Sequence, residues 1–136
     1  MTEQPRYILV IQSSKTELQK VEAFLKSIFE NHQLSEACLK KSFLCVSEAV
    51  INSIIHGNKN IVSRKITVIV DYLHQSIFFS ITDEGDGFDI ENIPDPTLGI
   101  NLKKESGRGI HIIKSLSSFV RFNQKENSLQ FKIQCK

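Results

Sequence analysis

The chain has 136 residues, of which 40% are hydrophobic, so it can form one domain with a single core but not two ordinary domains. Its net charge of +2 comes from interspersed acidic and basic residues, without the basic stripe that nucleic-acid binding requires. No apolar run approaches the roughly 18 residues of a membrane span, and the start lacks a signal peptide. We expect one cytoplasmic domain over residues 1–136.

The cysteines Cys38, Cys45 and Cys135 are odd in number and lack the spacing of zinc ligands. Disulfides are rare in the cytoplasm, and free Cys packs as a small hydrophobe. We therefore expect three buried thiols, with neither a disulfide nor a structural metal.

The first quarter of the chain predicts a strand and then a helix. Residues 7–11 are rich in strand-forming side chains. Ser14 and Glu17 form a capping-box pattern that leads into a helix through about Asn31.

A second helix is predicted from a cap at Ser35 to an end at Gly57. Its apolar residues recur at helical spacing: Phe43, Val46, Val50 and Ile54.

The remaining chain predicts strands around one more helix. Residues 66–72 and 77–82 are joined by a short connection and form an antiparallel hairpin. A long loop follows, then a helix over 107–117 and two strands over 119–123 and 129–133. This order predicts an α+β fold, a two-layer α/β sandwich with a mostly antiparallel sheet and helices on one face.

Polar residues form a stripe on the second predicted helix, where Glu48, Asn52 and His56 are spaced four residues apart. A carboxylate here can orient or deprotonate a hydroxyl, and an amide oxygen one turn away can ligate Mg²⁺. The alternative is that these residues line the wet side of an amphipathic helix.

Asp83 follows an apolar strand and precedes Gly85 and Gly87. A carboxylate at a strand end can accept a hydrogen bond from the amino group of adenine, whereas guanine presents a carbonyl oxygen there. The glycines let the backbone approach the base. An ordinary exposed turn remains an alternative, whereas the spacing of a calcium loop is missing.

Gly107, Arg108 and Gly109 open the third predicted helix, whose N-terminus favours an anion such as phosphate. Arg108, together with the nearby Lys103 and Lys104, can contact phosphates directly. A lone Gly-x-Gly is common, and the basic residues also suit a solvated loop.

The order of these three motifs resembles the Bergerat-fold ATPases, the superfamily that includes gyrase and histidine kinases. Within it, the chain resembles the bacterial anti-sigma factor serine/threonine kinases. The resemblance spans most of the chain and rests on these segments: Glu48-x-x-x-Asn52-x-x-x-His56-Gly57, Asp83-x-Gly85-x-Gly87 and Gly107-x-Gly109.

The resemblance implies a Mg²⁺-ATP-dependent protein kinase with Glu48 as catalytic base, Asn52 as Mg²⁺ ligand and Asp83 as adenine acceptor. It also implies an ATP lid over about residues 92–105. The nucleotide-binding set that we expect is Asn52, His56, Asp83, Gly85, Gly87, Lys103, Lys104, Gly107, Arg108 and Gly109.

The resemblance further implies two partners, a STAS-domain anti-sigma antagonist that receives the phosphate and a sigma factor that is sequestered. Such kinases often form homodimers. One departure is Glu105, since some members of the family carry Arg just before the Ser-Gly of the last motif. A non-catalytic, ATP-gated partner-binding regulator and a stand-alone histidine kinase catalytic domain are the alternatives.

Overall fold

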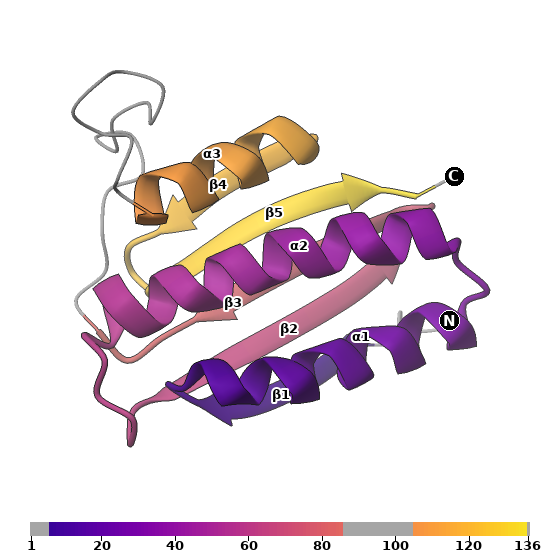
Figure 1. The fold of residues 1–136 in the computed structure, drawn as a ribbon. Helices are drawn as coiled ribbons and strands as arrows, with labels where there is room; N and C mark the ends of the chain where they lie inside the picture. Colours follow the sequence, from indigo (N-terminus) through magenta and orange to yellow (C-terminus); the bar gives the residue numbers. More distant parts are fainter. Residues whose placement is uncertain (1–5, 86–104, 136) are drawn as a thin grey trace.

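The computed structural model describes residues 6–85 and 105–135, and the side chains of residues 105–108 are not described. Helices and strands cover most of these residues and follow one another in the order that the sequence predicts (Figure 1). In chain order they are β1 (Arg6–Gln12), η1 (Lys15–Glu17), α1 (Leu18–Asn31), α2 (Glu36–Asn52), η2 (Ser53–Gly57), β2 (Lys65–Leu73), β3 (Ser76–Thr82), α3 (Glu105–Leu116), β4 (Phe119–Asn123) and β5 (Ser128–Gln134).

The strands of the described residues form one sheet in the order β1-β2-β3-β5-β4, and every neighbouring pair is antiparallel. Register places apolar residues opposite one another on the inner face, as Val70 faces Phe79 and Phe79 faces Phe131. The two phenylalanine rings stack with centroids 5.0 Å apart. Inner-face residues alternate with outward ones, the pattern of a sheet covered on one side.

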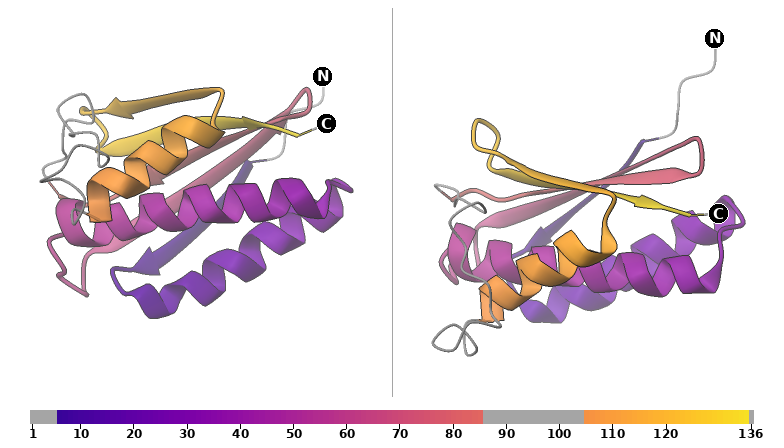
Figure 2. Two further views of the ribbon diagram at one scale, coloured as in Figure 1. Left: turned by 45° about the horizontal axis from the view of Figure 1, so that its top comes forward. Right: turned by 90° about the horizontal axis from the view of Figure 1, so that it is seen from above.

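The three helices of the described residues lie on the same face of this sheet (Figure 2). Their apolar stripes bury against the inner strands, with Leu25 and Phe29 from α1, Val46 from α2 and Ile113 from α3 each at most 2% exposed. This two-layer arrangement confirms the α+β prediction.

The opposite face of the sheet carries several exposed apolar side chains. Ile8 is 58% exposed and Val10 is 55% exposed on β1, and Phe119 is 46% exposed on β4. An ion pair joins Arg6 to Asp71 across β1 and β2 at 3.0 Å. Within the described residues, no helix covers this face (Figure 2).

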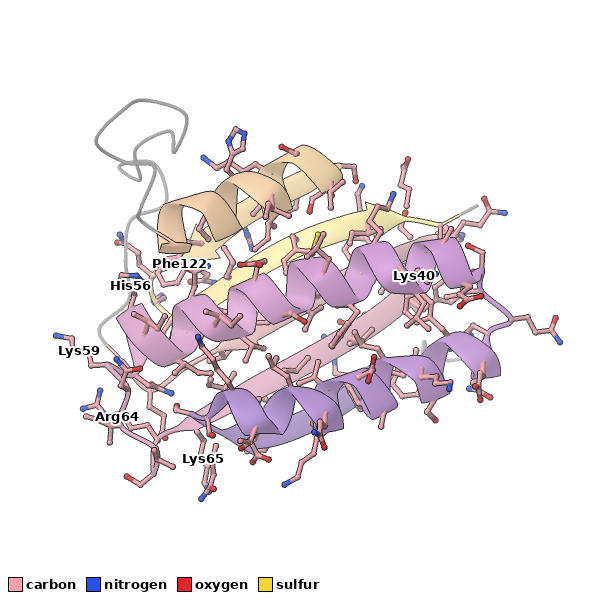
Figure 3. The ribbon with its side chains drawn as sticks, viewed as in Figure 1. Lys40, His56, Lys59, Arg64, Lys65 and Phe122 are labelled. Carbon is pink, nitrogen blue, oxygen red and sulfur yellow. A yellow bond between two sulfur atoms is a disulfide. The ribbon has the colours of Figure 1, made fainter. Side chains whose placement is uncertain are left out.

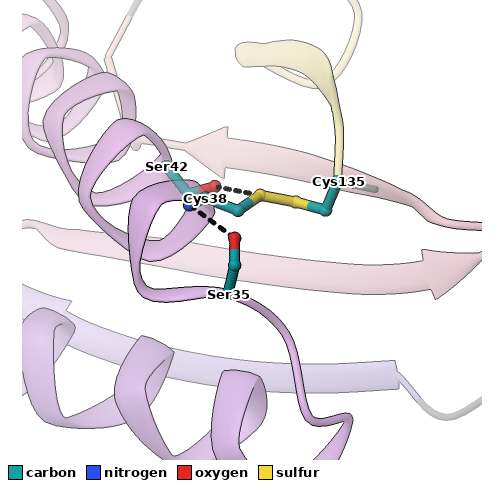
Figure 4. The surroundings of a disulfide bond; sticks show 4 residues. All are labelled: Ser35, Cys38, Ser42 and Cys135. Carbon is teal, nitrogen blue, oxygen red and sulfur yellow. Dashed lines mark hydrogen bonds between the residues drawn. A yellow bond between two sulfur atoms is a disulfide. The ribbon is translucent and has the colours of Figure 1, made fainter.

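The expectation of three free thiols is wrong for two of the cysteines. Cys38 in the first turn of α2 and Cys135 just after β5 form a disulfide (Figure 4). Their Cα atoms lie 5.8 Å apart, a normal separation for such a bond. Because 97 positions separate the two cysteines in sequence, their spacing held no sign of the pairing.

Cys45 is free and fully buried, as predicted. Desolvation raises the pKa of its thiol to about 11.

None of the helices of residues 6–85 and 105–135 is long and apolar enough to cross a membrane.

Candidate functional site

Two of the three sequence motifs meet around the end of α2, and the start of α3 packs beside them. The evidence is the space at three glycines, where a methyl group would strike a residue of another motif. Gly57 lies against the carboxylate of Asp83, Gly85 against the backbone of Gly57, and Gly109 against Glu48 and Asn52. The fold therefore gathers residues spaced more than 60 positions apart in the chain.

Asp83 sits directly after β3 and is only 6% exposed. Its Oδ1 accepts a hydrogen bond from the backbone N–H of Gly85 at 2.9 Å, and Ser53 also hydrogen-bonds to the carboxylate. Burial nevertheless raises the pKa of Asp83, because these bonds only partly offset the loss of water. A buried carboxylate with one oxygen engaged by its own turn retains capacity to accept a further hydrogen bond.

Close packing, rather than backbone conformation, requires glycine at positions 57 and 85. A Cβ at Gly57 would overlap the carboxylate of Asp83. A Cβ at Gly85 would overlap the carbonyl of Gly57, which is backbone and cannot swing aside. The absence of side chains at Gly57 and Gly85 thus lets the two backbone segments pack closely around the carboxylate.

Asn52 is 1% exposed at the end of α2. Its Nδ2 donates to the carbonyl of Glu48 one turn earlier, at 2.8 Å. Within the part of the chain that the structure describes, its buried Oδ1 has no hydrogen-bond partner. An unpaired buried amide oxygen is costly unless something else satisfies it, and it is a hard donor of the kind that Mg²⁺ prefers.

Glu48 is half-buried, and its Oε2 lies 2.7 Å from where a Cβ of Gly109 would stand. Asn52 Nδ2 lies 3.0 Å from the same point. The acid and the amide therefore both pack against α3 at Gly109. In residues 6–85 and 105–135, no three His, Cys, Asp or Glu side chains gather as a metal site. A cation held by Asn52 would need most of its ligands from water or phosphate, which is usual for Mg²⁺.

The helical stripe predicted through His56 does not continue past Asn52, because α2 passes into a π-helical turn, η2. The N–H of Asn58 donates to the carbonyl of Ser53 at 2.7 Å, a five-residue step. The wider turn rotates the residues that follow, and π-turns are frequent at functional sites. His56 is exposed, toward the same end of the molecule as Lys59 and Arg64 (Figure 3).

Several predicted site residues cannot be placed against this geometry. Gly87, Lys103 and Lys104 lie outside the described residues, as does the predicted lid except for Glu105. Gly107 and Arg108 fall in the first turn of α3, which begins at Glu105.

Sequence analysis missed two buried residues at the site, Ser53 and Asn58. Ser53 bonds to Asp83, and Asn58 accepts a hydrogen bond from the N–H of Glu84 at 2.8 Å. Asn58 directly follows Gly57, so a polar residue after the predicted helix end was the available signal.

Comparison with protein families gives a match over most of the chain. The family model described as the histidine kinase-like ATPase domain matches residues 11–133, and the chain belongs to this family. Comparison with curated protein sequences gives no match.

Sixteen chains of solved structures match the fold. One is the crystal structure of the RsbU and RsbW domains of Rv1364c from Mycobacterium tuberculosis, with a TM-score of 0.67 and 16% sequence identity. The match covers 98% of this chain but 33% of the other, so this chain spans about a third of that protein's length. At this identity the likeness concerns the fold.

Proposed function

We propose that the protein is a Mg²⁺-ATP-dependent serine/threonine kinase that switches between partners, phosphorylating a STAS-domain anti-sigma antagonist and sequestering a sigma factor. The observation that carries the proposal is a pair of glycine contacts along α2 and η2: Asp83 packs against Gly57, and Glu48 and Asn52 pack against Gly109. Membership of the histidine kinase-like ATPase family supports ATP as the ligand. The motif resemblance to anti-sigma factor kinases and the fold likeness to a structure that includes an RsbW domain support the partner class.

Asp83 supplies the base recognition in this proposal. Gly85 and Ser53 engage the carboxylate, whose two oxygens keep capacity to accept one more hydrogen bond, from the amino group of adenine. Guanine offers a carbonyl oxygen at that position, which would face a carboxylate without a proton between them.

Glu48 and Asn52 supply the reacting end. Asn52 Oδ1 is the buried acceptor that suits Mg²⁺, and the bound ion would neutralise charge on the phosphates. Glu48, beside Gly109, orients the acceptor serine hydroxyl and receives its proton. Neither role depends on Glu105, whose carboxylate would not stabilise a phosphate.

The experiment that tests the proposal pairs nucleotide binding with phosphate transfer. Calorimetric titration of wild type with Mg²⁺-ATP and Mg²⁺-GTP should show binding selective for adenine. Transfer of labelled γ-phosphate to a STAS-domain protein should follow in wild type. Glu48→Ala should bind ATP within about threefold of wild type yet lose at least ~100-fold of the transfer rate, the usual size of a general-base contribution.

Each outcome separates the possibilities. Equal transfer by wild type and Glu48→Ala would remove Glu48 from the mechanism. ATP-dependent partner capture without phosphorylated product would replace the kinase with an ATP-gated regulator. Acid-labile phosphate on the product would indicate a histidine kinase instead.

A further inference from the structure

Asn58 is fully buried immediately after η2, and its side-chain amide connects three separate chain segments. Nδ2 donates to Ser13 Oγ at 2.6 Å and to the carbonyl of Lys65 at 3.1 Å. Oδ1 accepts from the backbone N–H of Glu84 at 2.8 Å. Both donor hydrogens and the carbonyl oxygen are therefore engaged.

The two sides of this amide have different partners. The Nδ2 side faces the scaffold, where Ser13 also donates through its hydroxyl to the carbonyl of Arg64 at 2.8 Å. The Oδ1 side faces the turn that carries Asp83, because Glu84 lies between Asp83 and Gly85. Asn58 thus ties the end of β1 and the start of β2 to the turn after β3.

A second contact holds the same turn from the other side. Glu84 Oε1 accepts a hydrogen bond from the backbone N–H of Lys65, the residue whose carbonyl Asn58 engages. Glu84 is therefore fixed through its main chain by Asn58 and through its side chain by β2. Asp83 directly precedes Glu84, so this fixation restrains the backbone that carries the carboxylate lying against Gly57.

We propose that Asn58 is the positioning residue for base recognition: its Oδ1 holds the turn so that the Asp83 carboxylate meets the adenine amino group. This role rests on the proposed function and adds a specificity determinant to it. Asn58 itself does not touch the base. It acts on Asp83 through the N–H of Glu84. Loss of this acceptor would release the main chain of the turn, which would then be held to β2 through the Glu84 side chain.

Two variants separate this role from a contribution to folding. Asn58→Ala removes both sides of the bridge, whereas Ser13→Ala removes a scaffold partner and leaves the Oδ1 bond to Glu84 in place. A loss of folded protein lowers the apparent affinity for ATP and GTP by the same factor. The ratio of the two affinities therefore reports on positioning alone.

The test measures Kd for ATP and GTP by competition against a fluorescent ATP analogue, with Mg²⁺, on wild type and both variants. Asn58→Ala should lower the preference for ATP over GTP by at least about tenfold, the size of one lost buried hydrogen bond. Ser13→Ala should melt at a lower temperature but keep the wild-type preference within about twofold, since its contact lies on the scaffold side.

The outcomes are distinguishable. If wild type binds neither nucleotide, the proposed function fails, and this role with it. If wild type prefers ATP and Asn58→Ala keeps the full preference, the positioning role is wrong while the proposed function stands.

Hydrogen exchange covers the case in which Asn58→Ala does not fold. In wild type, the Glu84 amide should exchange at least about tenfold more slowly than an unprotected amide, because its N–H is bonded to a buried acceptor. Exchange at the unprotected rate would overturn the proposal without any variant.

Discussion

The carboxylate of Asp83 loses water on folding, and burial raises its pKa above the ordinary value. Above the unfolded pKa of about 3.9, the unfolded chain releases the proton more readily than the folded one. The contribution of Asp83 to stability is therefore most favourable below that pH and is lost as pH rises through the raised folded pKa. The residue proposed to recognise adenine makes the nucleotide-free protein less stable at neutral pH.

Asp83→Asn should consequently melt at a higher temperature than wild type at pH 7 and at nearly the same temperature near pH 3. The same change should weaken ATP binding by about tenfold or more, because one side-chain position becomes a donor and either Gly85 or adenine loses its acceptor. Thermal melts from pH 3 to 8 and calorimetry at pH 7 measure the two effects. A variant less stable than wild type at pH 7 would contradict the sign of the pKa argument.

At the scale of elements, α3 approaches α2 closely where Gly109 faces Glu48 and Asn52. Gly109→Ala would place a Cβ 2.7 Å from Glu48 Oε2, so the acid must move. We expect the variant to stay folded, since the obstacle includes the far end of a side chain, and to lose at least ~10-fold of its phosphate transfer rate, because small misplacements of reacting groups are costly.

The matched control is Ser115→Ala on the exposed part of the same helix, where the hydroxyl donates to the carbonyl of His111 at 2.9 Å. It should change neither melting temperature nor transfer appreciably. If Gly109→Ala transfers phosphate at the wild-type rate, Glu48 tolerates displacement, and its assignment as the base is weakened.

Helix N-caps and the alternation of apolar residues in strands were the basis of most element predictions. Ser35 caps α2 through the N–H of Cys38 at 3.1 Å, as predicted. The β2–β3 hairpin is confirmed, although His74 and Gln75 both take positive φ without a glycine. The predicted capping box formed in another way, since Ser14 accepts from Thr16 and Glu17 accepts from the N–H of Gln12.

The parts that sequence reasoning could not supply depend on geometry that no local pattern encodes. A helical period of 3.6 residues assumes a uniform helix, so it could not reveal the π-helical turn or the exposure of His56. Asn58 carries no motif of its own, and its importance arises from partners at Ser13, Lys65 and Glu84 that only the fold brings near.

At the scale of the whole molecule, the disulfide between Cys38 and Cys135 ties α2 to the end of β5 across 97 positions. Closing so long a loop restricts the unfolded chain and is worth about 4.7 kcal/mol in the chain-entropy model. Cys135→Ser should therefore lower the free energy of unfolding by roughly this amount relative to oxidised wild type. Urea denaturation measures the difference.

The control for the disulfide is a reducing agent. Added dithiol should bring wild type close to Cys135→Ser and should leave the variant itself unchanged. Unreduced and reduced wild type with the same urea midpoint would mean that the bond does not contribute to stability.

The same bond divides the chain mechanically. A pull applied through the residues before Cys38 and after Cys135 passes across the two sulfur atoms and bypasses everything between them. About 330 Å of extended chain length would not be released by the force, at roughly 3.4 Å for each residue between the two cysteines. In an optical trap, oxidised protein would lengthen only by the residues outside the bond, which include β1 and α1, and the residues between Cys38 and Cys135 that form the proposed nucleotide site would not be extended.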